Sequence, residues 1–380
     1  MLKRLYISNF RNLVNFEFTP SELSLLLGPN GAGKSSVLDV LAKLRAYIID
    51  NGNVSDIFPP TDFNRWHNDN EIKQLFELDI AGNGGLYRYR LVTSCLRDTG
   101  QVRMEEEELR FQDKALFHFT IQEGQATAQL YRDGGTKGPE MLANWSISGV
   151  GFLQPRKDNT QLVAFRERLA RLFVVKLNPE KMAKEGSETI HEAQHPAPDL
   201  SNFASWYLHL LQESNDKVFH MTEALKKRLP GFITLALVSS GERKVLKAKF
   251  RFSDMEREVL FGLNELSDGQ RATIVLHAFL HCLPDADVTL CVDEPENYLA
   301  LPEIQPWLDA IYDRVEDDRM QALIVSHHPR LINMLTNEGA FWIQQDPNVG
   351  LARIKPITVQ EGALGLPVSQ LVERGWIYDA

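Results

Sequence analysis

The sequence lacks long apolar runs: nowhere do about eighteen apolar residues follow one another, and the first residues alternate apolar and polar side chains. A membrane-spanning helix would need such a run, and a signal peptide would need a shorter apolar block near the start, so the sequence argues against both. Cysteine is also scarce. The three cysteines show no CxxC spacing and leave one unpaired, which fits a reducing compartment. We therefore expect a soluble, cytoplasmic protein.

An excess of positive charge is missing as well. Lys and Arg number 41 and Asp and Glu number 51, so the formal net charge is −10 and contact with nucleic acid would need a local basic patch or a partner. The middle of the sequence, about residues 50–260, shows no sustained heptad pattern and no repeat of 20–50 residues, which argues against a long coiled-coil arm. The length of 380 residues favours two or three domains, or one large domain with an insertion.

Two regions with strong strand and helix patterns lie before and after a middle region in which short strand-like runs and helix candidates are mixed. Residues 23–28 form a continuous apolar run that predicts a buried strand, and a helical apolar period follows over residues 34–48. Similar patterns return near residue 260. We therefore expect an α/β head split by a compact α+β insertion, with boundaries at 1–50 and 259–345 for the head, 51–258 for the insertion, and 346–380 for a closing strand and helix.

Within the middle region, three stretches carry more specific expectations. Residues 108–121 read as one strand-like run, and residues 202–229 as one long helix ended by Pro230-Gly231. Residues 178–200, rich in proline, read as a mobile connection.

The stretch GPNGAGKSS at residues 28–36 has the spacing G-x-x-x-x-G-K-S between a predicted strand and a predicted helix. Glycines let backbone N–H groups surround phosphate oxygens, while the lysine supplies a positive charge and the serine hydroxyl an Mg²⁺ ligand. The following helix directs its N-terminus at the anion. The sequence therefore predicts a P-loop that begins at Gly28, with nucleotide contacts from Asn30, Gly31, Gly33, Lys34, Ser35 and Ser36.

A second apolar run, VTLCVDEPE, ends in the acids Asp293 and Glu294. A carboxylate at the carboxyl end of a central strand lies next to the phosphate site of an α/β sheet. Asp293 is therefore a candidate for the Mg²⁺ shell. Glu294 is a candidate general base that polarises the attacking water.

The stretch LSDGQ at residues 266–270 predicts a helix start, because Ser267 can cap a helix that begins near Asp268 or Gly269. The free N–H groups and positive dipole end of such a helix are a second phosphate-binding device. One chain rarely needs two γ-phosphate sites, whereas a head-to-tail dimer can use one from each copy. Taken alone, the stretch fits an ordinary capped helix equally well.

The stretch LIVSHHP places His327 directly after a predicted strand, where its imidazole can hydrogen-bond a γ-phosphate or a water molecule. A lone histidine is more often a loop residue without such a role. The neighbouring His328 leaves the choice between the two open.

Together and in this order, GPNGAGKS, LSDGQ, VTLCVDEP and IVSHHP resemble the Walker A, signature, Walker B and switch-histidine elements of the ABC-type ATPase superfamily. The resemblance covers about residues 1–45 and 260–345. The start, LKRLYISNFRNLVNFEF, is similar to SMC/RecF-type chains. DEPENYL and SHHPRLIN are similar to bacterial SMC-like AAA ATPases, including the ATPase part of OLD-type nucleases and anti-phage ATPases.

This resemblance implies an ABC-type P-loop ATPase head that uses ATP and Mg²⁺ and dimerises on ATP. It assigns Lys34 and Ser35 to phosphate and Mg²⁺, and Glu294 and His327 to catalysis. Ser267 and Gly269 would contact the γ-phosphate bound by the partner copy. Arg11 matches an arginine that related chains place near the nucleotide, and Gln154, after an apolar strand, is the candidate Q-loop glutamine.

The sequence departs from these relatives in three ways. The missing coiled coil argues against a true SMC protein or a double-strand-break repair ATPase. About fifty residues follow His327, too few for the Toprim nuclease domain of an OLD-type enzyme. PENYLALPEIQ lacks the histidine that relatives often carry after ENxL, which puts the D-loop assignment of residues 297–301 in doubt.

Two charged stretches bear on partners. Lys247, Lys249 and Arg251 fall on one face of a predicted strand over residues 243–252, opposite Ala248, Phe250 and Phe252; with residues 226–228 they are the best candidate for contact with a phosphate backbone. A solvated face of a half-buried strand explains the same pattern. The run EEEE at 105–108 reads as a solvated acidic face.

The function predicted from these features is that of an ATPase that regulates a separately encoded effector, a nuclease, in bacterial phage defence or DNA maintenance. A RecF-like clamp that binds DNA under ATP control is the alternative. A transporter ATPase subunit is disfavoured by the N-terminal pattern and the insertion.

Overall fold

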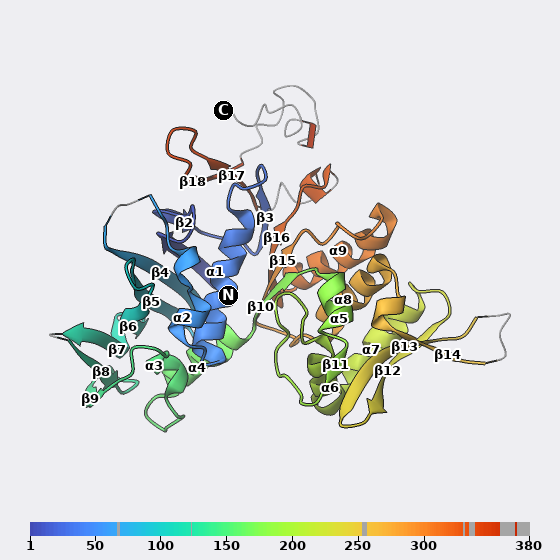
Figure 1. Cartoon of the computed structure of the whole chain (residues 1–380), viewed down its shortest axis with the longest axis horizontal. Helices are drawn as coiled ribbons and strands as arrows, with labels where there is room; N and C mark the ends of the chain where they lie inside the picture. The colour runs from blue at the N-terminus through green and yellow to red at the C-terminus, as the bar shows by residue number, and fades with distance from the viewer. Residues whose placement is uncertain are drawn as a thin grey trace. The chain divides into compact units, whose positions relative to one another are not determined.

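The computed structural model describes residues 1–66, 69–122, 124–252, 257–329, 331–333, 339–357 and 369–370. The chain divides into two compact units (Figure 1). The first comprises Met1–Leu172 and Pro329–Ala380, and the second comprises Phe173–His328. This division falls at residues other than the boundaries proposed from the sequence.

An eight-stranded antiparallel sheet dominates the first unit, in the order β2-β1-β4-β5-β6-β7-β8-β9. Its strands are β1 (Leu2–Ser8), β2 (Phe16–Phe18), β4 (Glu71–Gly82), β5 (Gly85–Leu96), β6 (Val102–Phe111), β7 (Lys114–Gln122), β8 (Gln125–Tyr131) and β9 (Lys137–Leu142). Strands 71–142, which the sequence assigned to the insertion, thus share a sheet with the N-terminal strands. The expected single run over 108–121 is wrong: the chain turns at Gln112, whose φ is 53°, to form the β6–β7 hairpin.

The acidic run at 105–108 is not a solvated face, because β6 turns its side chains alternately to the two sides of the sheet. Glu107 is fully buried. It accepts hydrogen bonds from the Tyr89 hydroxyl at 2.9 Å, the Gly149 N–H at 2.7 Å and the Ser148 hydroxyl. Burial raises the pKa of this carboxyl group.

The strand–turn–helix expected around residue 28 is confirmed. β3 (Leu23–Leu27) is buried along its whole length and pairs in parallel with β17 (Ala340–Gln345), which pairs antiparallel with β18 (Ala352–Pro356). The helix α1 (Lys34–Ile49) starts directly after the glycine-rich turn. The unit also contains α2 (Val54–Ile57), η1 (Pro60–Asp62), α3 (Gly149–Phe152) and α4 (Thr160–Ala170). The closing helix expected near the end of the chain falls outside the described residues apart from 369–370.

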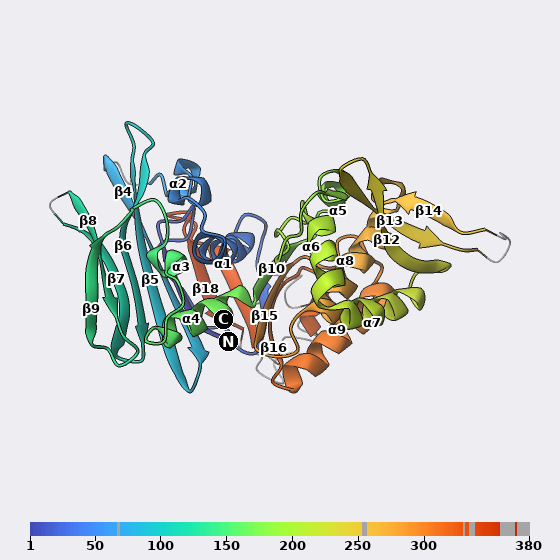
Figure 2. The same ribbon diagram turned by 90° about the horizontal axis from the view of Figure 1, so that it is seen from below.

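The second unit combines a parallel sheet with a small antiparallel one. β15 (Val288–Asp293) lies between β10 (Leu172–Lys176) and β16 (Met320–Val325), to which it is parallel. In the other sheet β13 (Arg243–Phe250) pairs with β11 (Glu188–Thr189), β12 (Phe232–Ser240) and β14 (Val259–Gly262). Figure 2 shows the helices of this unit grouped beside these strands: α5 (Pro179–Lys184), α6 (Phe203–Glu213), α7 (Asn215–Lys226), α8 (Asp268–Cys282) and α9 (Leu301–Glu316), with the short η2 (Leu263–Glu265) before α8.

Two expectations for this unit are wrong. The single helix over 202–229 is two helices, α6 and α7, with a break at Ser214, whose φ of −147° and ψ of 45° are not helical. The connection over 178–200 is not uniformly irregular, because it contains α5 and β11. In the described part of the chain, no helix is long and apolar enough to cross a membrane.

Candidate functional site

The turn between β3 and α1 has backbone conformations that favour glycine. Gly28, Gly31 and Gly33 have φ values of 148°, 78° and 110°. A Cβ on Gly28 would lie 1.9 Å from the backbone oxygen of Ile343 on β17, a distance that no side chain allows. The turn therefore forms a cradle of bare backbone at the N-terminus of a sixteen-residue helix, the arrangement that binds phosphate.

The lysine of this turn lies against the loop that it follows. Lys34 is 5% exposed, and its ammonium group donates to the backbone oxygens of Gly28 at 2.8 Å and Pro29 at 3.0 Å. The next residue, Ser35, is exposed, so its hydroxyl group is accessible at the helix N-terminus. A buried positive charge beside backbone amides and a free hydroxyl suits a nucleotide phosphate and its Mg²⁺ ion.

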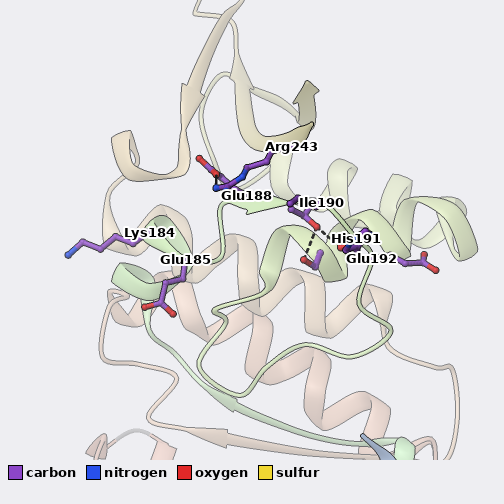
Figure 3. A pocket seen from close by; sticks show the side chains of 9 residues that line it. Lys184, Glu185, Glu188, Ile190, His191, Glu192 and Arg243 are labelled. Carbon is purple, nitrogen blue, oxygen red and sulfur yellow. Dashed lines mark hydrogen bonds and ion pairs between the residues drawn. The ribbon is translucent and has the colours of Figure 1, made fainter. Parts of the chain in front are cut away.

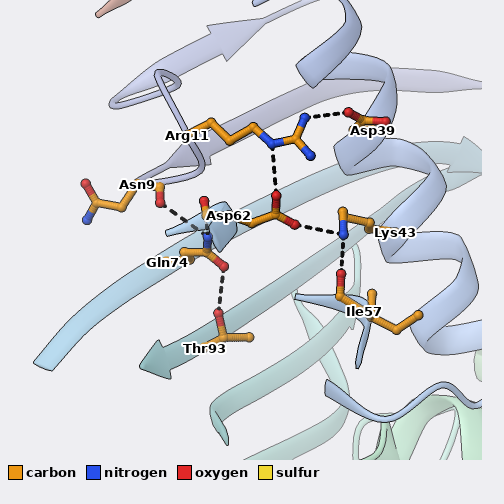
Figure 4. A network of polar contacts seen from close by, with 8 residues as sticks. All are labelled: Asn9, Arg11, Asp39, Lys43, Ile57, Asp62, Gln74 and Thr93. Atoms are coloured by element: carbon orange, nitrogen blue, oxygen red, sulfur yellow. Dashed lines mark hydrogen bonds and ion pairs between the residues drawn. The ribbon is translucent and has the colours of Figure 1, made fainter. Parts of the chain in front are cut away.

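Arg11 lies beside the same helix and is held by two carboxylates (Figure 4). Its Nη1 is 2.6 Å from Asp39 Oδ2 on α1, and its Nε is 2.9 Å from Asp62 Oδ1. Asp62 is 3% exposed and also pairs with Lys43 at 2.8 Å. These ion pairs raise the pKa of Arg11 against the opposing effect of burial, which is the largest single influence on it. Ion pairs therefore hold Arg11 in place, and its contact with nucleotide stays a prediction.

In the second unit, the acids after β15 meet the histidine after β16. Glu294, at φ 47°, directs its Oε1 to within 3.6 Å of His327 Nε2 and accepts a hydrogen bond from Asn297 Nδ2 at 2.6 Å. The Glu294 N–H donates to the Val325 carbonyl at 2.9 Å, which continues the register of the two parallel strands. Asp293 is the last residue of β15. The strand pairing thus brings Glu294 and His327 together from positions 33 apart in the sequence.

Glu296 is a site residue that the sequence did not single out. Its Oε1 accepts hydrogen bonds from the Ser326 hydroxyl at 2.6 Å and from the His327 N–H at 3.1 Å. These two hydrogen bonds connect the segment after β16 to the segment after β15. The sequence signal was only a third acid two residues after Glu294, and nothing local pairs it with Ser326.

The expected helix start at residue 267 is confirmed. α8 begins at Asp268, the Ser267 hydroxyl accepts from the Gln270 N–H at 3.2 Å, and the Gln270 side chain accepts from the Ser267 N–H at 2.9 Å. A Cβ on Gly269 would lie 3.0 Å from the Tyr298 carbonyl oxygen, so a larger side chain there would press on the backbone of Tyr298. The segment after β15 therefore packs against the first turn of α8.

Gln154 follows a short helix, α3, and not the expected strand. The side chain is exposed, while the backbone of its loop is fixed: Gln154 O accepts from Asn159 Nδ2 at 3.0 Å, and the neighbouring Leu153 O accepts from Arg166 at 2.7 Å. The role of Gln154 in nucleotide contact stays a prediction.

On the basic strand β13, Ala248 and Phe250 are buried while Lys247 and Lys249 are half-buried, as the alternation predicts. Phe252 lies beyond the strand and is 39% exposed. Glu258 pairs with Lys249 at 3.0 Å and with Arg251, so this patch is partly neutralised.

Figure 3 shows side chains that line a depression on the second unit. The depression has a volume of about 520 Å³, and none of the site residues predicted from the sequence lines it. Its wall carries charges of both signs, and the side chain of Glu188 pairs with Arg243 at 3.0 Å. It is lined by Lys184, Glu185, Glu188, Thr189, Ile190, His191, Glu192, Ser205 and Arg243.

The predicted site residues thus form two groups, one in each unit. The first unit holds the P-loop, Arg11 and Gln154, and the second holds Asp293, Glu294 and His327 together with the start of α8 at Ser267 and Gly269. Among the described residues, no cluster of three or more His, Cys, Asp or Glu side chains is arranged to hold a metal ion. Mg²⁺ commonly takes one or two protein ligands and completes its shell with water and phosphate oxygens.

The comparisons with known proteins concern one sequence region and the fold. Residues 11–82 match the sequence model described as ABC transporter. Among solved structures, an SMC head bound to the C-winged helix domain of ScpA aligns over 95% of this chain and 99% of its own, with a TM-score of 0.52 and 11% identity. An Smc head with an extended coiled coil, bound to the C-terminal domain of ScpA from Pyrococcus furiosus, aligns over 99% of both chains, with a TM-score of 0.51 and 10% identity. No curated protein sequence matches the chain.

Proposed function

We propose that this ABC-type, SMC-like ATPase head binds ATP with Mg²⁺ and hydrolyses it to ADP and phosphate. The fold likeness and the match over the P-loop region support nucleotide binding. The observation that carries hydrolysis is the meeting of Glu294 and His327 at adjacent strand ends. A carboxylate placed this way can accept a proton from water, and an imidazole beside it can orient that water or a phosphate oxygen.

In this proposal each group has a separate task. The P-loop amides and Lys34 bind the phosphates, with further contacts from Asn30, Gly31, Gly33, Ser36 and Arg11. Mg²⁺, when bound, would neutralise the charge that develops on the phosphate groups. Ser35 Oγ and Asp293 would hold it, because both offer oxygen ligands and one stands at the helix N-terminus while the other ends β15.

The direct test is phosphate release by the purified chain with ATP and Mg²⁺. We expect turnover by the wild type, loss of at least about 100-fold in Glu294→Gln with nucleotide binding retained, and loss of binding in Lys34→Met. Lys137→Met, at an exposed lysine of β9, is the matched control and should keep wild-type turnover. Wild-type turnover in Glu294→Gln would refute the assignment of the base.

We further propose that hydrolysis requires two copies in a head-to-tail dimer. The capped start of α8 presents Ser267 and Gly269 at a helix N-terminus, a second anion-binding device on the same chain. Each copy would offer this helix to the nucleotide bound by the other. Specific activity should therefore fall as the protein is diluted, and a constant specific activity down to nanomolar protein would contradict the dimer.

The last part of the proposal is that the ATPase cycle controls a separately encoded effector, a nuclease, in phage defence or DNA maintenance. The solved SMC heads to which this fold is similar bind the protein ScpA, which supports a protein partner here. Co-purification of Glu294→Gln with the products of neighbouring genes, with and without ATP, tests this. Failure to retain any such product in ATP would count against it.

A RecF-like clamp that binds DNA directly is the alternative, and the basic side chains of β13 favour it. Lys247→Glu with Lys249→Glu should then abolish ATP-dependent retention of duplex DNA. The partial neutralisation by Glu258 weakens this alternative.

A further inference from the structure

We propose that Asn12 and Gln345 are positioning residues that hold the P-loop in its phosphate-binding shape. Both side-chain amides donate to backbone oxygens of the loop, from segments far from it in the sequence. This inference rests on the proposed nucleotide binding. It adds two residues outside the loop that fix the conformation of the loop backbone.

Asn12 lies directly against the loop. Its Nδ2 donates to the backbone oxygens of Ala32 at 3.1 Å and Gly31 at 3.3 Å. Its amide also packs on Gly33, where a Cβ would lie 3.1 Å from Asn12 Oδ1. Any side chain at Gly33 would therefore press on Asn12, so the two positions fit each other.

Gln345 supplies the second contact from the end of β17. Its Nε2 donates to Gly31 O at 2.8 Å, across 314 positions of sequence. The same strand lies against the start of the loop, where the backbone of Ile343 leaves no room for a side chain at position 28. The β17–β18 hairpin is also tied to the turn that carries Asn12, because the Ala352 N–H donates to Asn12 O at 2.9 Å.

These bonds orient the amides of the loop because a trans peptide is planar. The oxygen of one residue and the N–H of the next point in opposite directions across the peptide bond. Drawing the Ala32 oxygen toward Asn12 therefore turns the Gly33 N–H to the other side, away from Asn12. That N–H is one of the backbone donors that a P-loop offers to phosphate.

The same bonds reach Lys34 through one further step. With the Gly31 oxygen held by Asn12 and Gln345, the Ala32 N–H points to Pro29 and donates to its oxygen at 3.2 Å. Pro29 O also accepts from the Lys34 ammonium group at 3.0 Å. Loss of the two side-chain donors should therefore make the orientation of the loop N–H groups less fixed. It should do the same to the Pro29 oxygen that binds the Lys34 ammonium group.

The test measures the Kd for a fluorescent ATP analogue and the steady-state kcat and KM. We expect Asn12→Ala and Gln345→Ala each to raise Kd and KM by about 2- to 10-fold, the worth of one hydrogen bond, with kcat changed less than about twofold. Gln345→Glu, which places a carboxylate against the Gly31 oxygen, should raise Kd at least as much. Gln344→Ala, the neighbouring position on β17 that faces the other side of the strand, is the matched control and should bind like the wild type.

The outcomes separate this inference from the function it rests on. Tight binding by the wild type with unchanged Kd in Asn12→Ala, Gln345→Ala and Gln345→Glu would overturn the inference alone. Absence of binding by the wild type would overturn it together with the proposed function. If Asn12→Ala does not fold, its thermal midpoint will be lowered. The two variants of Gln345, an exposed residue, then still show whether Kd depends on the bonds to the loop.

Discussion

The Glu294 carboxylate and the His327 imidazole lie 3.6 Å apart, Oε1 to Nε2, although 33 positions separate them in the sequence. Parallel pairing of β15 with β16 matches Asp293 with Val325, so the residues that follow the two strands emerge at the same edge of the sheet. The proximity of the acid and the histidine is thus a consequence of strand register. Glu296 then fixes the segment that carries His327.

Replacement of Glu296 tests this fixing. Glu296→Ala removes the acceptor for the Ser326 hydroxyl and the His327 N–H, so we expect kcat for ATP hydrolysis to fall about tenfold while KM stays within about twofold. Steady-state phosphate release measures both constants. Glu296→Gln keeps one acceptor oxygen and should recover most of the activity. Equal losses in the two variants would mean that the charge, and not the hydrogen bonds, is what matters.

The buried Asp62 gives a second prediction, because it pairs with both Arg11 and Lys43. Asp62→Asn keeps the shape but removes the charge, and we expect the free energy of unfolding to fall by about 1–3 kcal/mol. With Arg11 less firmly held, KM for ATP should rise several-fold. Urea unfolding and phosphate release check the two effects.

The matched control is Asp113→Asn, at a carboxylate 98% exposed that pairs with Arg88 only at 3.7 Å. A pair this exposed contributes little, so the variant should match the wild type in stability and KM. A KM for Asp62→Asn equal to that of the wild type, with stability lowered, would limit Asp62 to a structural role.

His277 gives a prediction about pH. The side chain is 8% exposed on α8, and burial, with the nearby His281 and Arg228, lowers the pKa of His277 to about 4. In the unfolded chain the group takes up its proton near pH 6.5, so acidification favours unfolding. Stability should be fully present above about pH 6.5 and fall by up to about 3 kcal/mol as the pH drops toward 4.

The measurement compares urea unfolding of the wild type and His277→Asn at pH 7.5, 5.5 and 4.5, values chosen as about one unit above and one to two units below the ordinary histidine pKa. The variant should show a shallower loss of stability with acid than the wild type. His191→Asn, at an exposed histidine, serves as the control and should keep the wild-type slope. Parallel slopes for His277→Asn and the wild type would contradict the assignment.

The parts of the site that the sequence predicts are those set by local pattern. A continuous apolar run, a glycine turn and a helical period specify β3, the P-loop and α1, because all three depend on neighbours a few residues away. The start of α8 can also be predicted from local pattern, because a serine three residues before a glutamine forms a capping box within one turn.

The parts that the sequence did not predict depend on contacts between distant segments. Gln345 reaches Gly31 across 314 positions, and Glu296 reaches Ser326 across 30. Glu107 stands in a run of four acids with nothing local to distinguish it, and only its position on the inward side of β6 buries it. Such contacts are set by strand pairing and packing, which composition and short-range pattern do not specify.

The proposed joining of two copies of this chain by ATP into one composite site is tested by the mass of Glu294→Gln in solution. We predict that light scattering after gel filtration gives a monomer of 43.2 kDa without nucleotide and about twice that mass with ATP and Mg²⁺. Ser267→Arg, which places a bulky charge at the start of α8, should bind ATP and stay monomeric. A Glu294→Gln protein that is saturated with ATP and still has a mass of 43.2 kDa would show that ATP does not join two copies of the chain.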